Sequence, residues 1–198
     1  MKKTSITHPL EIDAVSPGNG LGRIGITFCP GKVDPYGHSG SWDRDLAADL
    51  DVIRDWGAKA VITLLEPHEF RSLRVQNIGQ EVQRRHMDWL HLPIADVSIP
   101  DETFEREWKS AGRKLRKMLR SGSDVVVHCR GGLGRAGTVA ARLLIELGAR
   151  PKKAIAEVRH ATLIRLCSRL FAAYPCLKRA ECPLERSVCL CSAQVAMD

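Results

Sequence analysis

Four short apolar runs alternate with helical patterns along this sequence, and that alternation restricts the possible folds more than any other feature. The runs are rich in β-branched residues or bounded by turn signals, as is typical of strands, and they span residues 23–28, 59–65, 87–92 and 124–129. Helical spacing of apolar residues marks residues 43–57, 101–120, 138–148 and 151–161. Strands joined by helices need crossover connections, which favour parallel pairing. The sequence therefore predicts an α/β fold with a mainly parallel central sheet flanked by helices.

The length of 198 residues suits one folded domain plus a tail. We expect an N-terminal segment over residues 1–22, the domain over 23–161 and an atypical Cys/Arg-rich tail over 162–198. Five of the seven cysteines lie in that tail, at spacings that fit neither a disulfide framework nor a zinc site: Cys167, Cys176, Cys182, Cys189 and Cys191. We expect no metal.

No run of residues is long and apolar enough to cross a bilayer, and no hydrophobic leader follows the first basic residues. We therefore expect a cytoplasmic protein without a membrane partner. The net charge of +7 is concentrated in residues 106–120, which have helical spacing and are typical of a solvated helix face. Because no aromatic residues are interleaved there for base stacking, we expect no nucleic-acid partner.

Residues 124–138 read DVVVHCRGGLGRAGT and allow two interpretations. Residues 132–137 match the G-x-G-x-x-G pattern of dinucleotide-binding turns. That site needs a second strand ending in an acid, which would hold a ribose hydroxyl. Here the chain continues through a helix, Gly148, Pro151 and another helix, so we interpret the match as accidental.

The alternative is a loop that holds phosphate against a cysteine thiolate. A strand delivers Cys129 to the loop, and Gly131, Gly132 and Gly134 can take positive φ so that backbone amides point inward. The start of the next helix adds its positive dipole end and stabilises a thiolate. Arg135 can grip two phosphoryl oxygens with its planar fork. This chemistry fits the motif His-Cys, five residues and then Arg, placed between a strand and a helix.

This spacing resembles the signature of cysteine-dependent protein tyrosine phosphatases. The longer runs HCRGGLGRAGTVAARLL and HLPIADVSIPD are similar to the dual-specificity branch, and within it to cyclin-dependent-kinase-associated phosphatases and their bacterial relatives. The resemblance covers residues 31–161 and implies a protein tyrosine phosphatase-like fold. It also implies hydrolysis of phosphomonoesters on phosphorylated protein substrates, without cofactor or metal.

The resemblance implies a role for each residue of the site. Cys129 attacks phosphorus, Arg135 and the amides of residues 130–135 hold the oxygens, and Asp96 is the general acid and then the base. Asp101 is the other carboxylate in that segment, and we interpret it as a helix cap. The expected substrate-binding residues are His128, which orders the loop, together with Arg130, Gly131, Gly132, Leu133, Gly134 and Glu66. His68, Glu69, Lys32 and Asp34 are further candidates for the mouth of the site.

Two departures from the family pattern leave an alternative open. The family has a serine or threonine after its arginine, and here Ala136 lacks the hydroxyl that stabilises the departing thiolate; Thr138 could replace it only if the helix start is shifted. The tail beyond residue 161 also departs from the bacterial relatives. The alternative is a catalytically impaired, phosphate-binding pseudophosphatase. The sequence does not decide whether the substrate carries phosphotyrosine or phosphoserine and phosphothreonine. It also does not decide the oligomeric state.

Overall fold

The computed structural model describes residues 2–37 and 40–173, with side chains up to residue 162. Predictions about Cys176, Cys182, Cys189 and Cys191 therefore fall outside the described residues, as does the side chain of Cys167. Within the described ranges, no helix has the length and apolar character needed to span a membrane.

A five-stranded sheet forms the centre of the fold, in the order β1-β2-β7-β5-β6. Its strands are β1 (Asp13–Val15), β2 (Ile24–Phe28), β5 (Ala58–Thr63), β6 (Asp88–His91) and β7 (Asp124–Cys129). All neighbours pair in parallel except β1, which runs antiparallel to β2. A second, two-stranded sheet joins β3 (Val33–Asp34) to β4 (Trp42–Asp43). The prediction of a mainly parallel sheet is confirmed, and β1 adds an edge strand from residues that we expected to precede the domain.

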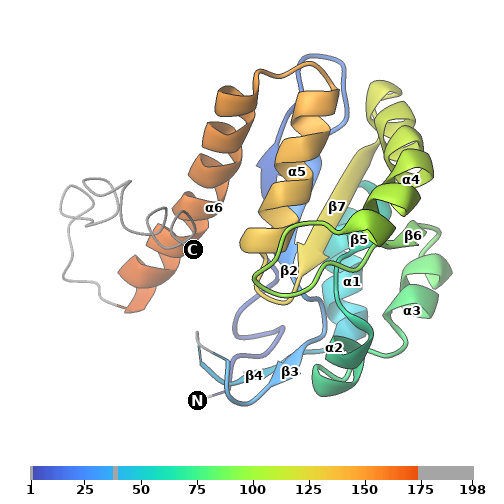
Figure 1. Ribbon diagram of the computed structural model, residues 1–198. Coiled ribbons are helices and arrows are strands. Elements are labelled where there is room, and N and C mark those ends of the chain that lie inside the picture. The colour runs from blue at the N-terminus through green and yellow to red at the C-terminus, as the bar shows by residue number, and fades with distance from the viewer. Residues whose placement is uncertain (1, 38–39, 174–198) are drawn as a thin grey trace.

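Helices cover both faces of this sheet (Figure 1). They are α1 (Leu46–Asp55), α2 (Pro67–Ser72), α3 (Ile78–Arg84), α4 (Glu102–Arg120), α5 (Gly134–Glu146) and α6 (Pro151–Ala173). One apolar cluster joins the sheet to α4, α5 and α6, and a second joins its other face to α1 and α3. The result is the expected arrangement of helices around a central sheet.

The side chains of β7 alternate between these two clusters. Val125, Val127 and Cys129 belong to the cluster that contains α5, whereas Val126 belongs to the opposite one. This follows from the two-residue period of a strand. The last residue of β7 thus brings the Cys129 side chain to the face covered by α5.

The ends of the helices show which local signals were informative. Gly57 has φ 104 directly after the C-terminal residues of α1, as a C-terminal cap requires. The side chain of Asp101 accepts a hydrogen bond from the Phe104 N–H at 2.8 Å, which confirms its interpretation as a helix cap. α5 begins at Gly134, at the early end of the expected start over residues 134–138. The short helices α2 and α3 were not predicted.

Candidate active site

The loops that follow β7, β6 and β5 lie at one edge of the sheet, because the carboxyl ends of parallel strands meet there. Figure 1 shows this edge at the lower end of β7, where the segment between β6 and α4 passes beside the start of α5. The loop from Cys129 to Arg135, called here the Cys129 loop, lies at its centre. It joins β7 directly to the first turn of α5.

The Cys129 thiol faces the backbone of its own loop. The N–H of Gly132 donates a hydrogen bond to Cys129 Sγ at 3.2 Å, and the positive end of the α5 dipole lies at the same loop. Gly132 has φ 76, and a Cβ there would lie 2.5 Å from the backbone nitrogen of Phe28, so this position requires glycine. Of the three glycines that could take positive φ, Gly132 does so, and Gly131 and Gly134 do not.

Cys29 is the other cysteine whose side chain the structure describes in the folded body, and its environment differs. It follows β2, the strand that pairs with β7, and it is completely buried. Burial raises the pKa of the Cys29 thiol far above its usual range. Cys29 is therefore a neutral core thiol, whereas Cys129 lies among N–H groups that stabilise negative charge.

A buried ion pair fixes the Arg135 side chain. Its Nη1 and Nη2 atoms donate to the two carboxylate oxygens of Glu69 at 2.6 and 2.9 Å, and both side chains are 3% exposed. Glu69 comes from α2, at the end of the neighbouring strand β5. We expected Glu69 at the mouth of the site. It is instead buried against Arg135, where its two carboxylate oxygens make a bidentate contact in the plane of the guanidinium.

Further contacts leave one edge of the Arg135 guanidinium available. Its Nη1 also donates to the carbonyl oxygens of Ile94 and Leu64, at 3.1 and 3.4 Å. Its Nη2 lies 3.2 Å from Asp96 Oδ1. The Nε–H makes no hydrogen bond to any residue that the structure describes. The edge formed by Nε and Nη2 can therefore receive an anion in place of Asp96, while Glu69 keeps the other edge.

Burial and charge act in opposite directions on this pair. Burial alone lowers the pKa of Arg135, but its bonds to Glu69 and the nearby Cys129 and Asp96 raise that pKa above its usual range. Burial alone raises the pKa of Glu69, but the bonds from Arg135 and from the Glu66 N–H outweigh it and lower that pKa. Both groups stay charged at neutral pH.

Asp96 lies on an exposed loop beside Arg135, and its side chain is 59% exposed. Its backbone N–H donates to Glu66 Oε2 at 3.2 Å, so Glu66 holds the loop of the expected general acid. The other candidate, Asp101, has its side chain engaged at the N-terminus of α4. The structure therefore brings Asp96, and not Asp101, to the arginine.

His128 lies completely buried under the Cys129 loop. Its Nε2 atom is 2.8 Å from Thr63 Oγ1, which also accepts a hydrogen bond from Trp89 Nε1 at 2.9 Å. Burial lowers the pKa of His128 to about 3. The imidazole is neutral and links β7 to β5 and β6 beneath the site.

Two residues, one from β3 and one from the turn before it, hold Arg130, the second residue of the Cys129 loop. The buried Lys32 donates from Nζ to the Arg130 carbonyl oxygen at 3.4 Å. Asp34 accepts from Arg130 Nη2 at 3.0 Å, and its side chain is 8% exposed. Both were expected at the mouth, and the structure makes them supports of the loop. His68 is exposed on α2.

The residues that follow Arg135 have no hydroxyl directed at the thiol. Ala136 is fully buried in the same apolar cluster as Cys129. Thr138 is exposed, and its Oγ1 donates to the Gly134 carbonyl oxygen at 3.1 Å. Because α5 begins at Gly134, Thr138 does not take the place of the missing serine or threonine.

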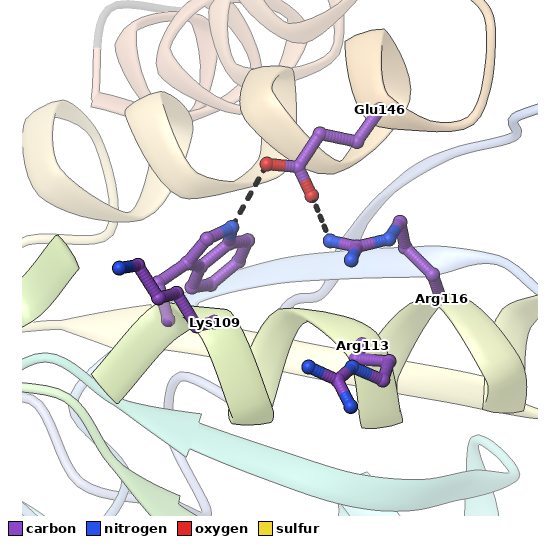
Figure 2. A pocket seen from close by; sticks show the side chains of 5 residues that line it. Lys109, Arg113, Arg116 and Glu146 are labelled. Carbon is purple, nitrogen blue, oxygen red and sulfur yellow. Dashed lines mark hydrogen bonds and ion pairs between the residues drawn. The ribbon is translucent and has the colours of Figure 1, made fainter. Parts of the chain in front are cut away.

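A hollow lies between α4 and α5, away from Cys129 (Figure 2). It is lined by Trp108, Lys109, Arg113, Arg116 and Glu146. Glu146 accepts hydrogen bonds from Trp108 and Arg116, while Lys109 and Arg113 are exposed on the basic face of α4. The residues that line this hollow include neither a cysteine nor a serine.

The sequence interpretation missed several supporting residues. The placement of Glu69 behind Arg135 depends on α2, a single short helix with little apolar periodicity to reveal it. Thr63 and Trp89 appeared only as strand residues. Two signals were available: Thr63 ends β5 beside the Cys129 loop, and Glu66 and Glu69 form the capping box that begins α2 at Pro67. Among the side chains described, no three His, Cys, Asp or Glu residues group as metal ligands.

Comparison with known proteins gives a family match. A family model described as "Polymorphic toxin system, DSP-PTPase phosphatase" matches residues 37–149. Cyclin-dependent kinase inhibitor 3 of Rattus norvegicus is 30% identical over 118 residues, which are 59% of this chain and 54% of that protein. The Homo sapiens protein of that name matches to the same extent. The chain thus spans about half the length of the curated relatives it matches.

Solved structures agree with this match. A kinase-associated phosphatase with its catalytic-site cysteine replaced by serine superposes with a TM-score of 0.66 at 25% identity, over 77% of this chain and 84% of that one. The active form of Tk-PTP superposes with a TM-score of 0.54 at 27% identity, over 75% and 84%. Both resemble this chain over most of its described part.

We predict that Glu69→Gln weakens phosphate binding and destabilises the fold. The substitution leaves the Arg135 charge buried beside a neutral amide, a loss of about 3–5 kcal/mol when one partner of a buried pair is removed. Denaturant unfolding and the inhibition constant of inorganic phosphate measure the two effects. Glu105→Gln, in the exposed pair with Arg142, is the control and should change stability by about 1 kcal/mol or less. Equal effects of the two substitutions would contradict the role of Glu69.

We also predict that the His128 ring stays uncharged from pH 8 down to about pH 4. An unfolded imidazole titrates near pH 6.5, so between that pH and about 3 the unfolded chain binds more protons than the folded one. This contribution to stability is complete above pH 6.5 and is lost as the pH falls. NMR titration of the ring, assigned by its absence in His128→Gln, measures it; a midpoint between pH 6 and 7 would refute the prediction.

Proposed function

Because the chain belongs to the DSP-PTPase phosphatase family of polymorphic toxin systems, we propose that it hydrolyses phosphomonoesters on proteins through a cysteinyl-phosphate on Cys129. One observation carries the proposal: Cys129 and an Arg135 with one free edge lie at the two ends of a single loop. We assign the activity to residues 23–161. The relatives' names point to kinases as substrates, and we include phosphorylated kinases in the expected class.

In the first step, Cys129 Sγ attacks phosphorus and the bond to the leaving oxygen breaks. Backbone N–H groups of residues 130–135 and the free edge of Arg135 bind the three other oxygens. Asp96 gives its proton to the leaving oxygen. The phosphate replaces Asp96 at Arg135 Nη2, which places the carboxyl group beside the phosphoryl group.

In the second step, water attacks the cysteinyl-phosphate and Asp96 accepts its proton. The S–P bond breaks and the Cys129 thiolate returns to the Gly132 N–H. No hydroxyl from Ala136 or Thr138 assists this departure. We propose that breakdown of the intermediate is slower than its formation.

The pseudophosphatase is the second candidate, and Ala136 is the observation that favours it. Such a protein would keep the loop and Arg135 and bind phosphate without completing turnover. A cytoplasmic location and the lack of nucleic-acid and membrane partners stay predictions from composition. Both phosphotyrosine and phosphoserine or phosphothreonine stay in the proposed substrate class.

We predict that the intact chain hydrolyses a simple aryl phosphate in reductant without added metal. Cys129→Ser should abolish turnover because it removes the thiolate, and Asp96→Ala should lower it by about 10²–10⁴-fold. Asp101→Ala, which removes only the cap of α4, is the matched control and should retain most of the rate. A folded but inert intact chain that still binds phosphate would favour the pseudophosphatase.

We predict a burst of aryl alcohol, close to one per protein, before a slower steady state. Ala136→Ser should raise the steady-state rate by roughly tenfold or more, as one hydrogen bond to a charged leaving group allows. Thr138→Ala is the control, since its hydroxyl bonds to Gly134 and should not affect the rate. Rapid-quench kinetics measure both phases. Linear turnover that Ala136→Ser leaves unchanged would show that breakdown does not limit the reaction.

A further inference from the structure

Several exposed large apolar side chains belong to the Cys129 loop or to loops that form ion pairs with it. The described part of the chain has seven exposed large apolar side chains in all: Ile6, Tyr36, Val52, Val97, Ile99, Leu133 and Ile155. Four belong to loops at the carboxyl edge of the strands, and we call these four the apolar rim: Tyr36, Val97, Ile99 and Leu133. Single exposed apolar residues are ordinary, but a group of them around one site marks a binding surface.

Ion pairs tie these loops to the Cys129 loop. Val97 directly follows Asp96, which lies 3.2 Å from Arg135, and Leu133 precedes that arginine by two residues. Tyr36 follows Asp34 by two residues, and Asp34 holds Arg130 at 3.0 Å. The rim residues therefore belong to three loops that meet at the site.

The backbone at Val97 is strained without any gain in packing. Its φ is 53, a region that β-branched residues rarely adopt, and its side chain is 97% exposed. Such strain costs about 1–3 kcal/mol and is concentrated at functional sites. The Val97 N–H donates to Asp96 Oδ1 at 3.1 Å, so the turn that brings Asp96 to Arg135 also presents Val97 to solvent.

Charge near the rim disfavours acidic partners. The segment 93–105 carries four acids, Asp96, Asp101, Glu102 and Glu105, and no lysine or arginine. The two arginines of the Cys129 loop are already paired, Arg130 with Asp34 and Arg135 with Glu69. The exposed cations nearest in sequence are Arg106, which directly follows this segment, and Arg71 and Arg74, in and after α2. Asp96 lies beside Arg135, Glu105 pairs with Arg142 and Asp101 caps α4. Within residues 93–105, an acidic side chain next to the phosphorylated residue therefore finds no cation to pair with.

We propose that the apolar rim binds large apolar side chains on both sides of the phosphorylated residue, so that the preferred substrates are phosphopeptides with apolar flanks. Leu133 and Tyr36 contact one flank, and Val97 and Ile99 contact the other. The inference rests on the proposed function for its substrate. It adds that the protein selects its substrates by the residues that flank the phosphorylated residue.

The test uses three phosphotyrosine peptides of equal length, with leucine, serine or glutamate flanking the phosphotyrosine. The intact chain should prefer leucine to glutamate flanks by tenfold or more in kcat/KM. The double variant Tyr36→Ser/Ile99→Ser should lose at least fivefold on the leucine peptide, and keep its rates on the serine peptide and on an aryl phosphate. Ile6→Ser/Ile155→Ser removes two exposed apolar side chains away from the site and should change nothing.

Equal kcat/KM for the three peptides, or equal behaviour of the two double variants, would overturn the inference. A second readout separates this failure from failure of the proposed function. Binding of the same peptides to Cys129→Ser needs no turnover, and affinities in the order leucine, serine, glutamate would support the rim even if the intact chain were inert. Identical affinities in an active protein would refute the rim and leave the phosphatase intact.

Discussion

The buried pair of Arg135 and Glu69 is the interaction on which the rest of the site depends. A guanidinium and a carboxylate withdrawn from water are tolerated only when their geometry is good and their remaining hydrogen-bonding groups are satisfied. Here Arg135 Nη1 also donates to the carbonyl oxygens of Leu64 and Ile94, which follow β5 and β6, and the Nε–H is left without a partner among the described residues. One side chain thus joins α5, α2 and two strand ends, and the position of the anion-binding edge follows from these contacts.

Buried residues also hold the Cys129 loop at its other end, near Arg130. Lys32 and Asp34 hold Arg130, and His128 links β7 to Thr63. Each support is buried and paired, so little charge is left unbalanced when no anion is present. The loop is therefore preorganised: its N–H groups and arginine need little rearrangement when charge arrives.

Local patterns predicted the frame of the fold, and contacts between distant residues determined the remainder. The four strands and the helices α1 and α4 could be predicted because their periodicity and caps, such as Asp101 and Gly57, lie within the segments themselves. β1, α2 and α3 are too short to show a period. β1 forms by pairing with β2, and α2 begins at a capping box between Glu66 and Glu69. The Cys129 and Arg135 spacing was recognisable for the same local reason. In contrast, only the fold shows that Glu69 is buried and that Glu66 holds the Asp96 loop. The fold also shows which of the three loop glycines, Gly132, has positive φ.

The start of α5 inside the Cys129 loop has a consequence for how such a protein can evolve. Arg135 and Ala136 are buried residues of the first turn, so the chemical half of the site is continuous with the apolar core and shares its resistance to change. The surrounding loops contribute exposed side chains, whose replacement costs the fold little. Under the proposed function, variation in these loops would change the choice of target and leave the reacting residues in place.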